Sequence, residues 1–199
     1  VALDTVSMHI RKGEFVAIIG ASGSGKTTML NIIGGLDTDY MGSCVVRNKE
    51  ISSLSDVECC TLRSRYISYV YQFFNLISFL TVKENVCLAS QIKGKKVDAK
   101  ELNQVLKLLG LEHKKDRFAN ELSGGQQQRV AIGRAILAHT DIILADEPTG
   151  NLDGENAENV MDILKVLNGK GKTIVLVTHD LRIANYADRI IRLEQGKIV

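Results

Sequence analysis

The residues with the clearest chemical potential form a glycine-rich stretch near the start of the chain, Gly20-Ala21-Ser22-Gly23-Ser24-Gly25-Lys26-Thr27. The stretch matches G-x-x-x-x-G-K-[ST], a pattern whose glycines let successive backbone N–H groups point at one anion. Lys26 can reach the outer phosphates of a nucleotide, and the Thr27 hydroxyl can hold Mg²⁺. The pattern predicts a phosphate-binding loop, although a glycine-rich turn carrying a surface lysine would also match it.

Two adjacent acids, Asp146 and Glu147, directly follow the apolar run 142–145. Acids at the end of a buried strand are costly without cationic partners, and ligands of parallel sheets bind at the carboxyl ends of the strands. We therefore expect Asp146 near a Mg²⁺ ion and Glu147 where it can polarise an attacking water. Solvated acids at an ordinary strand end are the alternative interpretation.

Two further segments are candidates for phosphate contacts. His179 follows the apolar run 173–177 and is expected at the same sheet edge, near a γ-phosphate, although a lone histidine is often structural. Leu122-Ser123-Gly124-Gly125-Gln126 opens a helix with a hydroxyl and two glycine amides, which makes a second anion-binding helix start. A head-to-tail dimer explains this second site, because each copy would complete its partner's site. A flexible loop with a good helix N-cap is the alternative.

These residues need a framework of strands that alternate with helices. Apolar or β-branched runs predict strands at 16–19, 43–47, 66–70, 142–145 and 173–177, and a final hairpin of 189–193 and 197–199. Helices are expected at 27–35, 99–109, 126–138 and 154–168. This alternation predicts an α/β fold with a mainly parallel sheet covered on both faces. Together with the phosphate-loop pattern, it predicts a P-loop NTPase core with a small antiparallel β part and an inserted α-helical subdomain. Residues 1–199 would form one domain, with the core at 1–72 and 126–199 and the helical subdomain at 73–125.

The composition narrows the functional classes. The 199 residues are 45% hydrophobic, enough for a sizeable core. Because 25 basic residues stand against 23 acidic ones, no strong basic field predicts a nucleic-acid partner. No run of 18 apolar residues predicts a membrane span, and a start at Val1 is expected of a fragment. The cysteines lack metal-ligand spacing and are expected to be free thiols in a reducing cytosol; they are Cys44, Cys59, Cys60 and Cys87.

Taken in order, the motifs resemble those of the ATP-binding-cassette (ABC) family along essentially the whole chain. The glycine-rich stretch is similar to its Walker A loop, Gln72 to its Q-loop glutamine, and the segment 122–126 to its signature. The segment 142–147 resembles the Walker B strand, Asn151-Leu152-Asp153 the D-loop, and His179 the switch histidine.

The resemblance implies hydrolysis of ATP with Mg²⁺ as cofactor. Catalytic roles are implied for Glu147, His179, Gln72 and Lys26, and metal binding for Thr27, Gln72 and Asp146. Contacts with the nucleotide are implied for Gly20, Ser22, Gly23, Ser24, Gly25, Lys26, Thr27, Thr28, Ser123, Gly124, Gly125, Gln126 and Asp153, those of the signature acting from the opposite chain.

The stretches 31–37 and 146–153 resemble a narrower branch, which contains macrolide exporters, lipoprotein-release systems and antimicrobial-peptide-resistance transporters. This implies a dimer, expected to be a homodimer, bound to an integral membrane permease subunit at the cytoplasmic face of the cell membrane. A short permease helix would dock at Phe73-Phe74-Asn75-Leu76, aromatics that plain core packing would also explain. The rival class is a soluble, non-transport ATPase of DNA repair or chromosome structure, whose long coiled-coil or zinc insertions this sequence lacks.

The sequence departs from the family pattern at several positions. No Phe, Tyr or Trp precedes Phe15, so an adenine-stacking aromatic residue is expected before Val1 or not at all. Gly133 stands where alanine is common, which costs about 1 kcal/mol of helix preference. Ser78, Ala119 and Thr140 stand where related sequences often carry proline. These changes affect the helical insertion and its borders rather than the chemistry.

Overall fold

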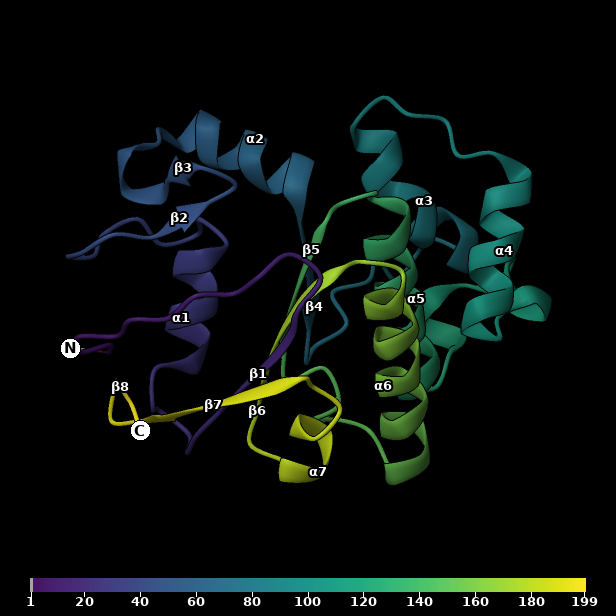
Figure 1. Ribbon diagram of the computed structural model, residues 1–199. Helices are drawn as coiled ribbons and strands as arrows, with labels where there is room; N and C mark the ends of the chain where they lie inside the picture. Colours follow the sequence, from purple (N-terminus) through teal and green to yellow (C-terminus); the bar gives the residue numbers. More distant parts are fainter. Residues whose placement is uncertain (1) are drawn as a thin grey trace.

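The computed structural model describes residues 2–199, and Val1 lies outside the described residues. One six-stranded sheet runs through the molecule in the order β4-β5-β6-β1-β7-β8 (Figure 1). All its neighbouring strands are parallel except β7 and β8, which form the predicted terminal hairpin. The strands of this sheet are β1 Phe15–Ile19, β4 Ile67–Tyr71, β5 Ile142–Asp146, β6 Thr173–Thr178, β7 Arg189–Glu194 and β8 Lys197–Ile198.

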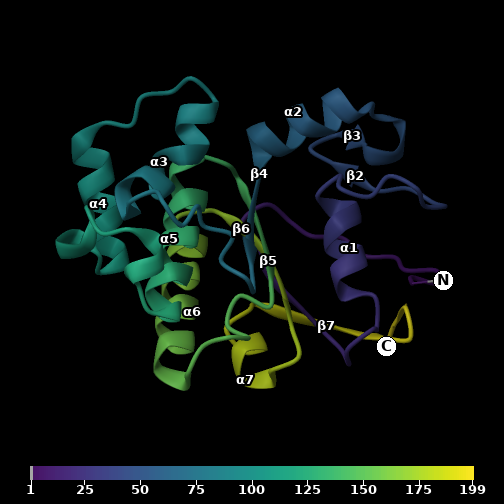
Figure 2. The same cartoon turned by 180° about the vertical axis from the view of Figure 1, so that it is seen from behind.

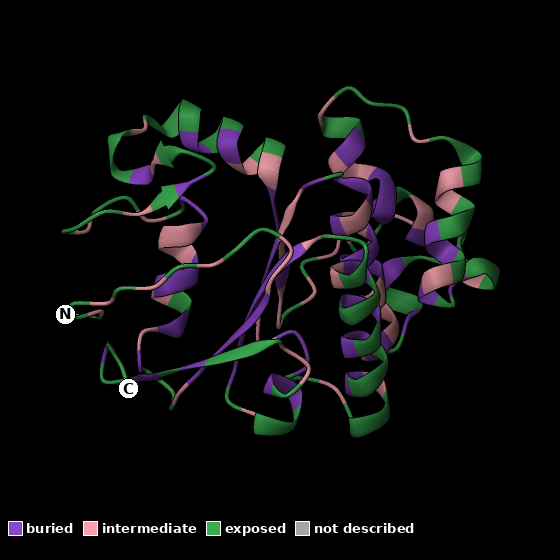
Figure 3. Ribbon diagram, in the orientation of Figure 1, coloured by how far each residue is buried: buried purple, intermediate pink, exposed green. Residues whose placement is uncertain are grey.

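Helices cover both faces of this sheet. Successive side chains of a strand point to opposite faces, so Phe15 and Ala17 of β1 join one buried cluster while Val16 and Ile18 join the other. The first cluster packs under α5 and α6, and the second under α1 and α2. Figure 3 shows the central strands buried and the outer faces of the helices exposed. The predicted α/β fold with a mainly parallel sheet is confirmed.

The remaining helices form a group to one side of the sheet. In Figures 1 and 2, α3 and α4 lie beside α5, across the molecule from α1 and α2. Val86, Leu106 and Leu109 belong to the same buried cluster as Phe15 and Ala17 of β1. One continuous core therefore joins this helical group to the sheet. The α-helices are α1 Lys26–Ile33, α2 Asp56–Tyr66, α3 Val82–Ile92, α4 Ala99–Leu109, α5 Gly124–Leu137, α6 Gly154–Gly169 and α7 Leu181–Ala184. Single 3-10 turns lie at Ile51–Ser53, Glu112–Lys114 and Ala119–Glu121.

The structure corrects several element predictions between α1 and β4. The expected strand 43–47 is only the two residues of β2 (Val45–Val46), which pair with β3 (Lys49–Glu50) in a small antiparallel sheet. Helix α2 was not predicted, and Tyr66 ends this helix rather than opening a strand. The signal for α2 is its capping box, in which Ser55 accepts from the Glu58 backbone N–H and Glu58 accepts from that of Ser55.

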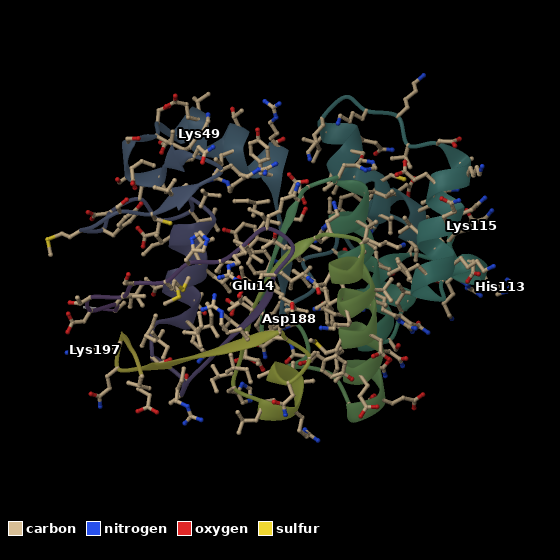
Figure 4. All side chains as sticks on the ribbon, viewed as in Figure 1. Glu14, Lys49, His113, Lys115, Asp188 and Lys197 are labelled. Carbon is tan, nitrogen blue, oxygen red and sulfur yellow. The ribbon has the colours of Figure 1, made fainter. Side chains whose placement is uncertain are left out.

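Polar side chains fasten the amino ends of the strands. The Phe15 N–H donates to Asp188 Oδ2 at 3.0 Å, and Arg189 Nε donates to Glu14 Oε1 at 2.8 Å. Figure 4 shows Glu14 and Asp188 together in the middle of the molecule, away from Lys197 on the terminal hairpin. Among residues 2–199, no helix is long and apolar enough to cross a membrane.

Candidate active site

The phosphate loop is the turn that joins β1 to α1. Gly23 and Gly25 adopt positive φ angles of 78° and 101°, a region that favours glycine. A Cβ at Gly20 would lie 2.2 Å from the Leu193 carbonyl oxygen, so only glycine fits against β7 there. Lys26 is 8% exposed, and its Nζ donates to the carbonyl oxygens of Gly20 and Ala21 at 2.8 and 2.9 Å. The loop therefore curls around its own lysine.

The turn of the terminal hairpin is hydrogen-bonded to this loop. The Gly196 N–H donates to the Ser24 carbonyl oxygen at 3.1 Å, and the Asp4 N–H donates to the Gly196 carbonyl oxygen at 2.8 Å. Ala2 passes so close that a Cβ at Gly25 would lie 2.4 Å from its carbonyl oxygen. Three segments far apart in the sequence thus meet at the phosphate loop.

Thr27 and Asp146 form the candidate metal site. The Thr27 hydroxyl donates to the two carboxylate oxygens of Asp146 at 3.1 and 3.4 Å. Burial raises the pKa of Asp146, and the neighbouring charge of Glu147 raises it further, whereas Thr27 and Lys26 oppose the rise. A partly buried carboxylate beside a hydroxyl is a site where a divalent cation would relieve the cost of the charge.

Glu147 and His179 lie together at the ends of the neighbouring strands β5 and β6. His179 Nδ1 and Glu147 Oε1 are 2.9 Å apart, and the glutamate side chain is 17% exposed. Glu147 has a φ of 47°, uncommon for a residue with a side chain, and its N–H donates to the Val177 carbonyl oxygen at 2.9 Å. This backbone turn sets the carboxylate beside the histidine.

Gln72 follows β4 and lies against the segment after Glu147. Gln72 Nε2 donates to Asn151 Oδ1 at 3.1 Å, and Asn151 Nδ2 donates back to the Gln72 carbonyl oxygen at 3.1 Å. No hydrogen bond joins Gln72 to Thr27 or Asp146 among the described residues. Its predicted role as a metal ligand stays a prediction, and Asn151 is a partner that the sequence did not indicate.

The signature segment opens α5. The Ser123 N–H donates to Gln126 Oε1 at 3.2 Å. Gly125 lies so close to Asn156 that a Cβ there would be 2.2 Å from Asn156 Oδ1. Asn156 in turn donates through Nδ2 to both carboxylate oxygens of Asp153, at 3.0 and 2.9 Å. The structure therefore joins two predicted site segments through Asn156, a residue that sequence reasoning missed.

A pocket of about 500 Å³ lies over the phosphate loop. His179 shares this pocket with the loop, whereas the signature residues Ser123 and Gly125 do not line it. The predicted residues Gly20, Ser22, Gly23 and Ser24 line it together with Ile19, Ala21, Leu181, Arg192, Glu194 and Gln195. Arg192 and Glu194 had no motif to reveal them, and none of the lining residues is Phe, Tyr or Trp. Thr28 lies half-buried in the first turn of α1.

The hydrogen-bond donors, the lysine and the oxygen ligands of this site suit a nucleoside triphosphate with Mg²⁺. The Ser24 Oγ is buried and has no hydrogen-bond partner among the described residues, so it is available to a phosphate oxygen. Lys26 supplies a positive charge, and the start of α1 supplies N–H groups and the positive end of a helix dipole. The oxygens of Thr27 and Asp146 are the ligands that Mg²⁺ prefers.

Comparison with known proteins identifies relatives over the whole chain. A family model described as ABC transporter matches residues 3–150. The macrolide export ATP-binding/permease protein MacB of Campylobacter jejuni is 50% identical over 199 residues, which cover 99% of this chain and 31% of that protein. The uncharacterized ABC transporter ATP-binding protein MJ0796 of Methanocaldococcus jannaschii is 46% identical over 204 residues, which cover 99% of this chain and 87% of that protein.

A solved structure agrees with the sequence comparison. The dimeric structure of MJ0796, described as a bacterial ABC transporter cassette, matches this chain with a TM-score of 0.88 at 45% identity. The match covers 99% of this chain and 88% of that one. A second dimeric structure of MJ0796, described as a post-hydrolysis state bound to ADP and Pi, matches with the same TM-score.

Proposed function

This chain belongs to the ABC transporter family as an ATP-hydrolysing cassette, and we propose that it powers a membrane transporter of the export or force-transmitting type through ATP-dependent dimerisation. The chain spans 31% of the length of the macrolide-export relative from Campylobacter jejuni. Transport is therefore proposed for this chain rather than shown, and no transported substance is assigned. The name of that relative supports export as the direction of transport. The soluble, non-transport ATPase is not favoured, because the relatives are named as transporter proteins.

Within this proposal the phosphate loop binds the ATP phosphates. Lys26 and the loop N–H groups neutralise the charge of the phosphates, because phosphoryl transfer depends on positioning and electrostatic stabilisation. Thr27 and Asp146 would hold Mg²⁺, and Gln72, whose amide donates to Asn151 in this structure, would be a further ligand. When bound, the ion would neutralise charge that develops on the phosphate oxygens.

The observation that carries the proposal is the pair formed by Glu147 and His179 beside the phosphate loop. Their side chains are 2.9 Å apart at the carboxyl ends of adjacent strands. Glu147 orients a water and accepts its proton at a carboxylate oxygen. His179 is 70% exposed, lines the pocket over the loop, and holds the γ-phosphate from that side.

Replacing Glu147 with glutamine tests this role. Glu147→Gln preserves the shape of the side chain and removes the basic carboxylate. Loss of a general base lowers turnover by about 10²- to 10⁴-fold. We expect ATP binding to persist in equilibrium titration, phosphate release to fall by that factor, and ATP-filled dimers to accumulate in size-exclusion chromatography.

The control for this experiment is Glu155→Gln. Glu155 is an exposed acid in the first turn of α6, so its replacement changes the net charge equally and should leave turnover unchanged. Hydrolysis by Glu147→Gln at the rate of the unchanged protein would contradict the role of Glu147 as the base.

The signature is proposed to act on the nucleotide of a second copy. Ser123 and Gly125 open α5 and do not line the pocket over their own phosphate loop. In a head-to-tail dimer each copy would present Ser123, Gly125 and Asp153 to the partner's ATP. The dimeric structures of MJ0796 support this arrangement, and a homodimer is the simplest form of it.

A membrane permease is proposed to dock beside Gln72. Phe73 is 71% exposed and Phe79 is 76% exposed, whereas Phe74 is half-buried and faces Gly124. Core packing and permease docking therefore apply to different residues. Phe74 packs inward, whereas Phe73 is free to contact a short permease helix. This docking would place the chain at the cytoplasmic face of the cell membrane.

A further inference from the structure

Gln128 of α5 bridges two loops of the active site. Its side chain is 0% exposed, and its Nε2 donates to the carbonyl oxygens of Tyr71 and Pro148 at 3.1 and 2.7 Å. Tyr71 is the residue before Gln72, and Pro148 is the residue after Glu147. One buried amide group therefore holds the chain next to two proposed site residues.

The Gln128 amide links the two segments that follow strands β4 and β5. The parallel pairing of β4 and β5 ends at Tyr71 opposite Asp146, so the ladder no longer fixes the two segments beyond that pair. Gln128 links these segments just where the ladder stops. Its amide cannot reverse, because Oε1 would then face two carbonyl oxygens that can only accept. Oε1 itself is buried and accepts no hydrogen bond from the described residues.

We propose that Gln128 is a positioning residue that sets the distance between the Gln72 and Glu147 segments and ties both to the start of α5. The proposal rests on the roles given above to Gln72 and Glu147, and Gln128 itself does not touch ATP. Because α5 begins with the signature, the same amide connects the hydrolytic residues of one ATP site to the segment that serves the partner's site. Displacement of the signature helix would move Gln72 and Glu147 with it.

The test is Gln128→Met in the natural protein, assembled with the membrane permease proposed above. Methionine keeps the length of the side chain and removes both donors. The matched control is Asn168→Leu, because Asn168 Nδ2 also donates to two carbonyl oxygens, those of Gly13 and Lys172, at 2.8 and 3.0 Å. These carbonyls lie at the amino ends of β1 and β6, opposite the phosphate loop.

We expect both variants to unfold at lower temperature than the unchanged protein, since each removes the side-chain donor that serves two carbonyl oxygens. Only Gln128→Met should lower kcat by about tenfold or more, because misplacement of reacting groups by about 1 Å can cost on the order of 100-fold. The dissociation constant for Mg-ATP should stay within about threefold, since the phosphate loop is untouched.

A kcat for Gln128→Met within about twofold of the unchanged protein, or an equal loss of kcat in Asn168→Leu, would overturn the proposal. Should Gln128→Met fail to fold, Gln128→Asn decides by the same measurements, because its amide is one methylene too short to reach both carbonyls. Glu147→Gln is measured alongside. An active Glu147→Gln refutes the proposed base, whereas an inactive Glu147→Gln beside a fully active Gln128→Met refutes only the positioning role.

Discussion

Gly133 offers a prediction in which two effects of known size oppose each other. In an exposed helix, Gly→Ala would stabilise by about 1 kcal/mol. Gly133 is buried in α5, however, and a Cβ there would lie 2.7 Å from Leu109 Cδ1 and 3.0 and 3.3 Å from the two methyl carbons of Val86. Ordinary carbon contacts are about 3.5–4.0 Å, so the glycine lets α3 and α4 approach α5 closely.

The cost of overpacking decides the sign. The Leu109 methyl can rotate away, but Val86 is fully buried and β-branched, so it is stiff. Overpacking costs about 1–3 kcal/mol, and we take about 2. Gly133→Ala should then lower the free energy of unfolding by a net ~1 kcal/mol, which corresponds to about 2–4 °C in Tm for a chain of this size. When Val86→Ala is already present, Gly133→Ala should instead raise the free energy of unfolding by about 1 kcal/mol.

The test is urea and thermal unfolding, without nucleotide, of the unchanged chain, Gly133→Ala, Val86→Ala and the double variant. These measurements give the effect of Gly133→Ala on the free energy of unfolding with and without the Val86 side chain. Gly169→Ala is the control for helix preference alone, because Gly169 ends α6 and a Cβ there meets nothing within 4 Å. Stabilisation by Gly133→Ala in the otherwise unchanged chain, or additivity with Val86→Ala, would refute the close approach of α3 to α5.

Two further predictions concern the ATP site itself. Lys26→Ala and Ser123→Arg should each be inactive, yet mixed dimers should regain ATPase activity, because one composite site then keeps both elements; proven heterodimers that stay inactive would count against action in trans. Asp146→Asn should abolish Mg²⁺-dependent hydrolysis and raise the unfolding temperature of the nucleotide-free chain at pH 7. Burial raises the folded pKa of Asp146 above its usual 3.8, so the penalty for its charge is absent below pH 3.8 and grows as pH rises through the folded pKa. The gain in unfolding temperature should therefore vanish at low pH, and an equal gain at every pH would show another cause.

The sequence predicted best the elements that are apolar along their whole length. The buried strands β1, β5 and β6 lie within one residue of their predicted bounds, since short apolar runs rich in Ile and Val are typical of strands buried on both faces. Helix α2 was missed because only Cys59 and Leu62 of its eleven residues are buried, which leaves no helical period to detect. Its Ser55 and Glu58 capping box was the available signal.

The phosphate loop and the Asp146–Glu147 pair could be predicted because each is a contiguous motif next to a strand. The shared sheet edge of Glu147 and His179 was also predicted, but the direct contacts between side chains were not, since they depend on irregular backbone. Glu147 reaches His179 through a φ of 47°, and Asn75, which accepts from Arg134 at its carbonyl oxygen, has a φ of 49°. Glu147 is not a residue that favours positive φ, so nothing in its local sequence marks the turn, whereas asparagine is enriched at such angles and Asn75 was a signal that could have been used.

Strand order explains why motifs more than a hundred residues apart form one site. β1 lies between β6 and β7, and the chain leaves β1 through α1 on one face of the sheet but connects β5 to β6 through α6 on the other. A reversal of this kind opens a crevice at the carboxyl ends of the strands. The phosphate loop leaves β1 at that crevice. His179 follows β6, which pairs with β1, and Glu147 follows β5, the next strand beyond β6. Gln72 follows β4, the most distant of these strands from β1, which is why its position depends on side-chain contacts with Asn151 and on the backbone bridge made by Gln128.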